Sequence, residues 1–205
     1  MKQVVFAAAA LDAALSLPAQ AANVVDEWAS IQRPPAPALK AVTVDPKTTA
    51  LLMLDFMNQN CAKRPRCVES IPAMKKLLGE ARAAKAAVVY SIIANTTTAD
   101  VMTDVAPQAG EPHVQAGPDK FFRTDLEKIL KDKGITTVII TGTAANGAVL
   151  FTAAGAALRG MNVVVPVDGM SSADAYADLS TAWTFTNAPS VSGKTTLTKS
   201  EMIKF

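Results

Sequence analysis

The 205-residue sequence is poor in the residue types that mark several functional classes. Aromatic residues make up 5% of it, it holds one histidine and two cysteines, and its net charge is +2. One histidine and two cysteines offer little for a zinc site, and without a long Lys or Arg run there is no electrostatic footprint for nucleic acid. We therefore expect no metal, no cofactor and no nucleic-acid partner.

Long apolar runs are also scarce. None reaches 18 residues, and the N-terminal run over 4–17 is too short to span a bilayer comfortably. It follows Met1-Lys2 and ends at Ala19-Gln20-Ala21, a pattern typical of a cleaved export signal. A charged residue inside the run, Asp12, is unusual for an export signal and favours the alternative, a cytoplasmic N-terminal helix. We expect a signal peptide over 1–21 and a periplasmic or secreted protein, free of the membrane once the signal is removed.

The two cysteines, Cys61 and Cys67, are separated by five residues. In an oxidising compartment they could close a small disulfide loop, and the alternative is two free thiols. His113 is far from both in sequence and is more typical of a surface residue than of a metal ligand.

What is abundant is apolar sequence, at 50%, arranged in alternating strand-like and helix-like segments. After a Pro-rich arm over 22–45, one domain over 46–205 is expected. Strands are predicted over 50–54, 87–93, 137–141, 162–167 and 195–198, and helices over 71–87, 124–133, 145–159 and 173–186. This alternation predicts an α/β fold with a doubly wound, mostly parallel sheet flanked by helices.

Ligands of such sheets bind beyond the carboxyl ends of the strands. The residues there are Asp55, Asn95 with its neighbour Ala94, the pair Gly142-Thr143, and Asp168. Asp55 directly follows an apolar run, which should leave its carboxyl group partly desolvated. It is a candidate acid–base group, and the alternative is an aspartate that caps a turn or helix.

At these positions the chain resembles the isochorismatase-like hydrolase superfamily over 48–170. The resemblance rests on four ordered segments: LLMLDFMN over 51–58, FFRTDLE over 121–127, GITTVIITG over 134–142 and TAAGAALRGM over 152–161. Together they are specific, although each alone is weak. The resemblance implies a three-layer, Rossmann-like α/β fold and a small-molecule substrate, and members of the family often form oligomers.

Most members of that family use an Asp, a Lys and a nucleophilic Cys. The resemblance places the Asp at Asp55 and the nucleophile at Ala148, whose methyl group cannot attack a carbonyl, so covalent thiol catalysis at that position is excluded. Cys61 is a remote substitute for the thiol. The Lys position falls on Gln115 by counting, whereas Lys120 is the nearest lysine and the better chemical candidate.

Three explanations fit the alanine. The chain is an engineered Cys-to-Ala variant of a cysteine amidohydrolase, a relative that binds small molecules without catalysis, or a hydrolase that needs no thiol. The third resembles isochorismatases, which carry a small residue there and are thought to hydrolyse a vinyl ether with the Asp as general acid. We expect a hydrolase of the vinyl ether or amide class with Asp55 as acid or base, and a silent binding protein as the alternative.

The resemblance also implies a non-proline cis peptide, placed at Thr143–Ala144, and a cradle of backbone amides near Ala144 and Ala148. The metal-binding D-x-H-x-H pattern of nicotinamidases is missing from the sequence. The expected substrate-binding residues are Asn95, Gln115, Phe121, Thr143, Ala144 and Gly147.

Overall fold

The computed structural model describes residues 23–205, so the predicted signal peptide lies outside the described residues. The chain divides into two units at Pro35. In the described part of the first unit, the short helix α1 (Val24–Glu27) is capped by the side chain of Asn23. That side chain accepts hydrogen bonds from the backbone N–H groups of Val25 and Asp26, which supplies two of the partners that a helix start lacks.

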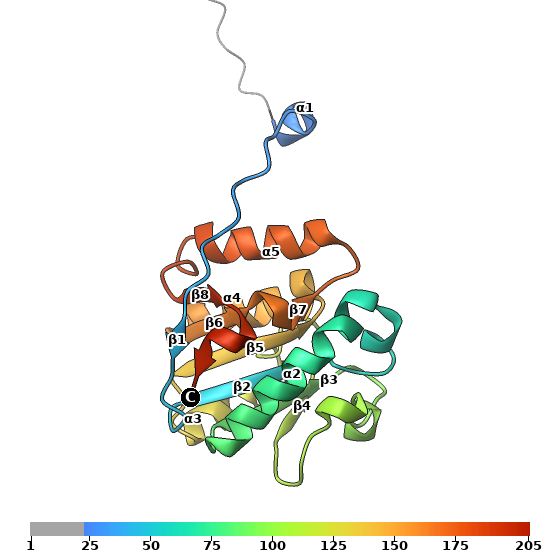
Figure 1. Ribbon diagram of the computed structural model, residues 1–205, viewed down its shortest axis with the longest axis vertical. Coiled ribbons are helices and arrows are strands. Elements are labelled where there is room, and N and C mark those ends of the chain that lie inside the picture. Colours follow the sequence, from blue (N-terminus) through green and yellow to red (C-terminus); the bar gives the residue numbers. More distant parts are fainter. Residues whose placement is uncertain (1–22) are drawn as a thin grey trace, which may run out of the picture. The chain divides into compact units, whose positions relative to one another are not determined.

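The second unit, residues 36–205, is built on a seven-stranded sheet in which every paired strand is parallel (Figure 1). The order across the sheet is β4 (His113–Gln115), β3 (Ala87–Ile92), β2 (Thr49–Leu54), β5 (Thr137–Thr143), β6 (Asn162–Pro166) and β8 (Thr195–Thr198), with β7 (Met170–Ser171) on the end of β5. A separate parallel pair joins β1 (Val42–Thr43) to β9 (Ile203–Lys204). Residues 36–45, assigned to the arm from sequence, thus include a strand of this unit. The predicted doubly wound α/β fold is confirmed.

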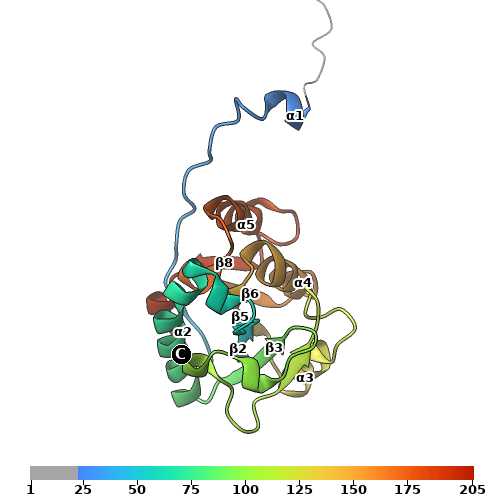
Figure 2. The same cartoon turned by 90° about the vertical axis from the view of Figure 1, so that its right-hand side faces the viewer.

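Helices cover both faces of the sheet because successive strand side chains point to opposite sides. Leu52 and Leu54 of β2 pack in the cluster that holds residues of α3 (Leu126–Asp132), α4 (Leu150–Leu158) and α5 (Ala175–Asn187). Leu51 and Met53 pack in the other cluster, which holds the apolar face of α2 (Pro65–Ala83). Figure 2 shows α2 on one side of the sheet and α3 and α4 on the other. The helices cover the faces of the sheet and not the carboxyl ends of its strands, where a site can therefore form.

The predicted start of the helix over 71–87 is wrong, because α2 begins at Pro65. Proline suits the first helical position, where the backbone has no intrahelical N–H bond to lose, and Pro65 rather than Pro72 occupies it. Ser70, the residue before that predicted start, lies inside the helix and donates its hydroxyl to the carbonyl of Cys67 at 2.7 Å. Pro72 is tolerated within the helix.

Other predicted boundaries shift by a few residues. The predicted helix over 145–159 divides into a π-helical turn, Ala145–Val149, and α4. Residues 94–118, for which no element is predicted, contain β4 and two 3-10 turns, Thr98–Asp100 and Thr103–Val105. Further 3-10 turns span Cys61–Lys63, Val167–Gly169 and Ser200–Met202.

Cys61 and Cys67 form a disulfide, so the loop-closing alternative holds and the free-thiol alternative does not. Both cysteines are fully buried. Among residues 23–205, no helix combines the length and apolar character needed to cross a bilayer.

The strand order reverses between β2 and β5, which is the switch point where ligands of such sheets bind. Gly142 lets these two strands end close together. Its φ is 148°, and a Cβ at this position would clash with the backbone oxygen of Leu54. Asp55, the next residue after Leu54, itself has a φ of 56°, in the left-handed region that non-glycine residues seldom adopt. The backbone therefore turns sharply at the candidate acid.

Candidate active site

Asp55 lies at the end of β2, and both oxygens of its carboxylate accept hydrogen bonds. Ser91 of β3 donates its hydroxyl to Oδ1 at 2.6 Å. Lys120 donates from Nζ to Oδ2, also at 2.6 Å. The residue is 5% exposed. Both carboxylate oxygens therefore have hydrogen-bond donors within the protein.

Lys120 comes from the segment between β4 and α3 and is fully buried. Its Nζ also donates to the carbonyl of Gly117 at 2.8 Å and to that of Ala116 at 3.4 Å. The three N–H groups of the ammonium therefore have acceptors within the protein. Of the two residues that the sequence offered for the lysine position, Lys120 is the one beside Asp55. Gln115 instead donates its side-chain amide to the carbonyls of Ile93, at 3.0 Å, and Thr96, at 3.3 Å.

The π-helical turn that follows β5 faces Asp55. The peptide bond Thr143–Ala144 is cis, as the resemblance implies. The carbonyl of Ala144 accepts hydrogen bonds from the N–H groups of Gly147 at 3.1 Å and Val149 at 3.2 Å. The first N–H groups of a helix lack intrahelical partners and carry a partial positive charge, which suits them to bind an oxyanion.

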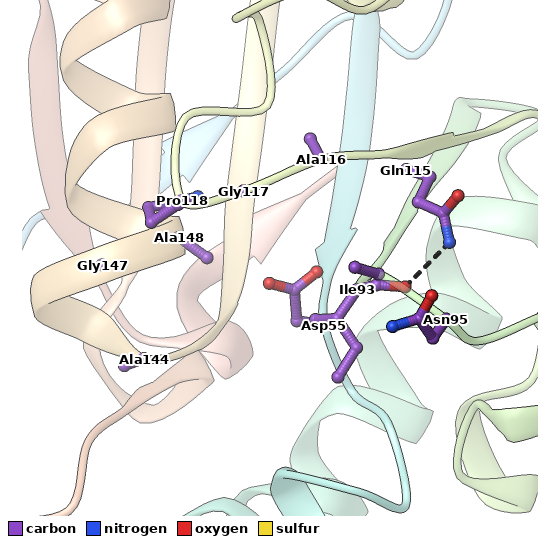
Figure 3. A pocket seen from close by; sticks show the side chains of 11 residues that line it. Asp55, Ile93, Asn95, Gln115, Ala116, Gly117, Pro118, Ala144, Gly147 and Ala148 are labelled. Atoms are coloured by element: carbon purple, nitrogen blue, oxygen red, sulfur yellow. Dashed lines mark hydrogen bonds between the residues drawn. The ribbon is translucent and has the colours of Figure 1, made fainter.

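A cavity of about 540 Å³ separates the two parts of the site. Figure 3 shows the carboxylate of Asp55 directed toward the wall that carries Ala148, with Asn95 and Gln115 on the other side. The remaining lining is mostly apolar or small, so the cavity suits a small organic molecule with few polar groups. The eleven lining residues are Asp55, Ile93, Ala94, Asn95, Gln115, Ala116, Gly117, Pro118, Ala144, Gly147 and Ala148.

Most of the site residues expected from sequence line this cavity, and three do not. Lys120 is one of the three and reaches the site only through its contact with Asp55. Phe121 is buried in the core against α4, because the segment turns after Lys120 and directs the ring inward. The guanidinium carbon of Arg159 lies 4.4 Å from the centroid of this ring. Thr143 is also buried, and its hydroxyl donates to the carbonyl of Ser171 at 3.1 Å. Within residues 23–205, no group of three or more His, Cys, Asp or Glu side chains could hold a metal ion.

Sequence reasoning missed two residues that support the ion pair. Ser91 is the polar residue in the otherwise apolar β3, and it is paired in register with Leu54, directly before Asp55. Thr152 of α4 accepts a hydrogen bond from the backbone N–H of Lys120 at 3.2 Å. A serine in a strand buried on both faces is a signal that could have identified Ser91.

The sequence of residues 49–189 matches the model of the isochorismatase domain family, which covers well over half of the chain. The chain belongs to the isochorismatase family. No curated protein matches its sequence. The family assignment agrees with the ordered motifs, with the cis peptide and with the position of Asp55 at the switch point.

Solved structures of isochorismatase-like proteins share the fold. A cysteine hydrolase from Pseudomonas syringae pv. phaseolicola is 19% identical, with a TM-score of 0.69 over 81% of this chain and 95% of that one. N-carbamoylsarcosine amidase from Thermoplasma acidophilum is 23% identical, with a TM-score of 0.64 over 75% and 97%. Nicotinamidase from Bacillus subtilis is 16% identical, with a TM-score of 0.67 over 74% and 99%. At these identities the likeness extends to the fold alone.

Proposed function

We propose that this isochorismatase-family protein is a hydrolase of small molecules in which Asp55 is the acid–base group and no thiol takes part. The observation that carries the proposal is the Asp55–Lys120 ion pair at the cavity, 2.6 Å long, with side chains 8% and 0% exposed. Removing two charges from water is costly, so a buried ion pair is weak evidence for stability. Its position at a cavity and a helix start gives it a chemical use.

The contacts of Asp55 favour the role of proton acceptor. Ser91 and Lys120 both donate to the carboxylate, so both of its oxygens act as acceptors toward their partners. Hydrolysis of a vinyl ether needs an acid that donates a proton, whereas hydrolysis of an amide by water needs a base that accepts one. Of the two substrate classes that fit the family, the geometry therefore favours the amide class.

In this mechanism a water molecule takes the place of the absent thiol. Asp55 accepts a proton from the water as its oxygen bonds to the substrate carbonyl carbon, and backbone N–H groups near Ala144 and Ala148 bind the resulting oxyanion. The C–N bond then breaks, and the proton held by Asp55 passes to the departing nitrogen. The methyl group of Ala148 is smaller and less polar than a thiol and leaves room for the water. Lys120 balances the charge of Asp55 before the proton is accepted and after it has been passed on.

Asn95 and Gln115 are proposed to orient the substrate. The side-chain N–H groups of Gln115 donate to two carbonyls of the loop after β3, so its Oε1 remains available as an acceptor at the cavity. Asn95 lines the same wall with a φ of 60°. An amide or hydroxyl group of the substrate matches this pair, and the apolar lining suits its carbon skeleton.

The test compares Asp55→Asn and Asp55→Ala with the native protein on a panel of small primary amides, ureides and vinyl ethers. We expect turnover of an amide by the native protein and a loss of at least about 100-fold in both variants, because general-base catalysis commonly contributes 10²–10⁴-fold. Asp104→Asn, which changes an exposed aspartate far along the chain, is the matched control and should retain full turnover. Retention of activity by both Asp55 variants would contradict the proposal.

One feature supports a second candidate, a binding protein without catalysis: Ala148 presents a methyl group at the position where the motif resemblance places the nucleophile. This candidate predicts that amides bind to the native protein, as measured by calorimetry, with no turnover. The variant Ala148→Cys separates the two. If the fold retains amidase geometry and lacks only its nucleophile, Ala148→Cys should gain turnover that the native protein does not have.

We also propose that residues 1–21 are a signal peptide and that the mature protein is periplasmic or secreted. Disulfides persist mainly in oxidising compartments, and the Cys61–Cys67 disulfide supports this location. Mass spectrometry of the protein recovered from the periplasm or medium should show an N-terminus at Ala22. A full-length, cytoplasmic protein would contradict the proposal.

A further inference from the structure

The helix start that faces Asp55 is also tied to the loop after β2. Arg64 donates from Nη1 to the hydroxyl oxygen of Thr143 at 2.9 Å, across 79 positions of sequence. The same hydroxyl donates to the carbonyl of Ser171 in β7 at 3.1 Å. Thr143 is the last residue of β5 and immediately precedes Ala144 of the cavity wall. One side chain thus connects the N-terminal end of α2 with the turn that carries Ala148.

The backbone of Arg64 is held inside the disulfide loop. Its N–H donates to the carbonyl of Cys61 at 2.9 Å, and its carbonyl accepts from the N–H groups of Cys67 at 2.9 Å and Val68 at 3.1 Å. Both sulfur atoms belong to side chains that are fully buried against the core beneath α2. The disulfide therefore fixes the two ends of the short segment from which the Arg64 side chain extends.

We propose that Arg64 is a positioning residue for the active site and that the Cys61–Cys67 disulfide is the clamp that directs it to Thr143. The proposal deepens the proposed function, on which its catalytic consequence rests, by adding a redox-sensitive control of the same site. A long arginine side chain loses considerable rotamer freedom when it is held in one contact. A disulfide that restricts its backbone lowers the number of conformations that compete with that contact. Reduction of the disulfide therefore loosens the turn that carries the oxyanion-binding N–H groups.

A neighbouring arginine provides a matched control. Arg66 lies two residues further along, inside the same disulfide loop, and its side chain is 48% exposed. It donates from Nε to Asp178 of α5 at 2.9 Å and has no contact with Thr143 among the hydrogen bonds of the described residues. Arg64 and Arg66 thus share a loop and a charge, and they differ in the element that they contact.

The first experiment measures hydrogen–deuterium exchange by mass spectrometry on peptides that cover the turn at 145–149. Arg64→Ala should raise exchange there about fivefold, the factor that one hydrogen bond commonly contributes. Arg64→Lys retains a donor and should recover part of the protection. Arg66→Ala should leave the turn unchanged. Unchanged exchange in Arg64→Ala, or an equal rise in Arg66→Ala, would overturn the assignment of Arg64.

The second experiment tests the clamp. Cys61→Ala/Cys67→Ala should raise exchange of the same turn, and adding Arg64→Ala should increase it little further, because both changes break one chain of contacts. Fully additive effects would show that the disulfide does not act through Arg64. If the double-cysteine variant fails to fold, the native protein is compared before and after reduction by a phosphine, with the same two outcomes.

A third readout follows site geometry without a substrate. In an Ala148→Cys background, iodoacetamide should label the new thiol faster than in the denatured protein. Arg64→Ala should slow that labelling about fivefold, for the reason given above, and Arg66→Ala should not. Equal labelling rates in the two arginine variants would count against positioning. Exchange and labelling do not depend on turnover, so a failure of the hydrolase proposal in the Asp55 variants is distinguishable from a failure here.

Discussion

Two lysine–aspartate pairs of nearly equal length occupy opposite surroundings in this protein. The Lys120–Asp55 pair measures 2.6 Å, and its side chains are 0% and 8% exposed. The Lys75–Asp104 pair, between α2 and a 3-10 turn, measures 2.7 Å, and its side chains are 62% and 59% exposed. The distance between the charges therefore says little about the energy of a pair. Screening by water reduces the exposed pair to a small contribution, whereas in the buried pair each charge depends on the other.

The difference in surroundings extends to the neighbouring polar groups. The buried pair belongs to a network in which Ser91 satisfies Asp55, and backbone carbonyls of the segment before Lys120 satisfy the ammonium group. A third pair, Arg82–Glu111, is intermediate, with side chains 23% and 14% exposed. The three pairs form a series in burial, which predicts a series of effects when one partner is removed.

The largest effect on stability is expected at Lys120. Lys120→Met retains much of the side-chain volume but leaves the carboxylate of Asp55 without its cation. Loss of one partner of a buried pair commonly costs 3–5 kcal/mol, and because Asp55 borders a cavity we expect about 3 kcal/mol in the free energy of unfolding. Urea unfolding followed by circular dichroism measures it.

The control for this prediction removes both charges. Lys120→Met combined with Asp55→Asn leaves no uncompensated charge, so the double variant should be more stable than Lys120→Met alone. A double variant less stable than Lys120→Met would show that Lys120 contributes through packing and not through its pairing with Asp55.

A smaller effect is expected at Arg82. Its Nε and Nη2 donate to the two carboxylate oxygens of Glu111, both at 2.8 Å, and Nη2 also donates to the carbonyl of Ala106 at 3.0 Å. The hydrogen bond to Glu111 raises the pKa of the guanidinium above its ordinary value. Arg82→Met should cost about 1.5 kcal/mol, at the lower end for hydrogen bonds between charged groups. If Arg82→Met has the same free energy of unfolding as the native protein, the Arg82–Glu111 pair does not contribute an amount between those of the buried and the exposed pair.

The same cluster predicts a pH dependence. Burial raises the pKa of the Tyr90 hydroxyl, which donates to the carbonyl of Val105 at 2.9 Å. In the unfolded chain a tyrosine loses its proton near pH 10, so above that pH the unfolded state binds fewer protons than the folded state. Stability contributed by neutral Tyr90 is therefore complete below about pH 10 and is lost as the pH rises further.

Tyr90→Phe should accordingly show a shallower loss of unfolding free energy between about pH 9.5 and 11 than the native protein. Tyr176, which is 64% exposed, supplies the matched control. Tyr176→Phe should follow the native curve. If Tyr90→Phe also follows it, the hydroxyl titrates alike in the two states and the argument from burial is wrong.

Of these three ion pairs, the sequence alone identified only Asp55 and two alternatives for its partner, Lys120 and Gln115. Asp55 was identifiable because an acidic residue directly after a buried apolar strand falls at the edge of a parallel sheet where ligands bind. The cis peptide at Thr143–Ala144 and the family followed from ordered motifs. These predictions succeed because strand pattern and motif spacing are local properties of the chain.

The partners of Asp55 could not be assigned in the same way. Lys120 lies 65 positions away, after an irregular stretch without periodicity, and counting alone placed the lysine at Gln115. The contact between Arg64 and Thr143, across 79 positions, carried no sequence signal either. Such pairings depend on how the loops pack over the switch point. The helix start at Pro65 was missed for a different reason, since both Pro65 and Pro72 suit the first turn of a helix.

The smallest effect is expected at the exposed pair, Lys75–Asp104. Lys75→Met should change the free energy of unfolding by at most about 0.5 kcal/mol, because exposed pairs gain little Coulomb energy and lose side-chain entropy. Raising the salt concentration should reduce even this difference, whereas the effect of Lys120→Met should persist, since ions do not reach a buried pair. If Lys75→Met cost as much as Lys120→Met, burial would not be what separates the two pairs, and the ion pair at the cavity would lose its distinction from a surface contact.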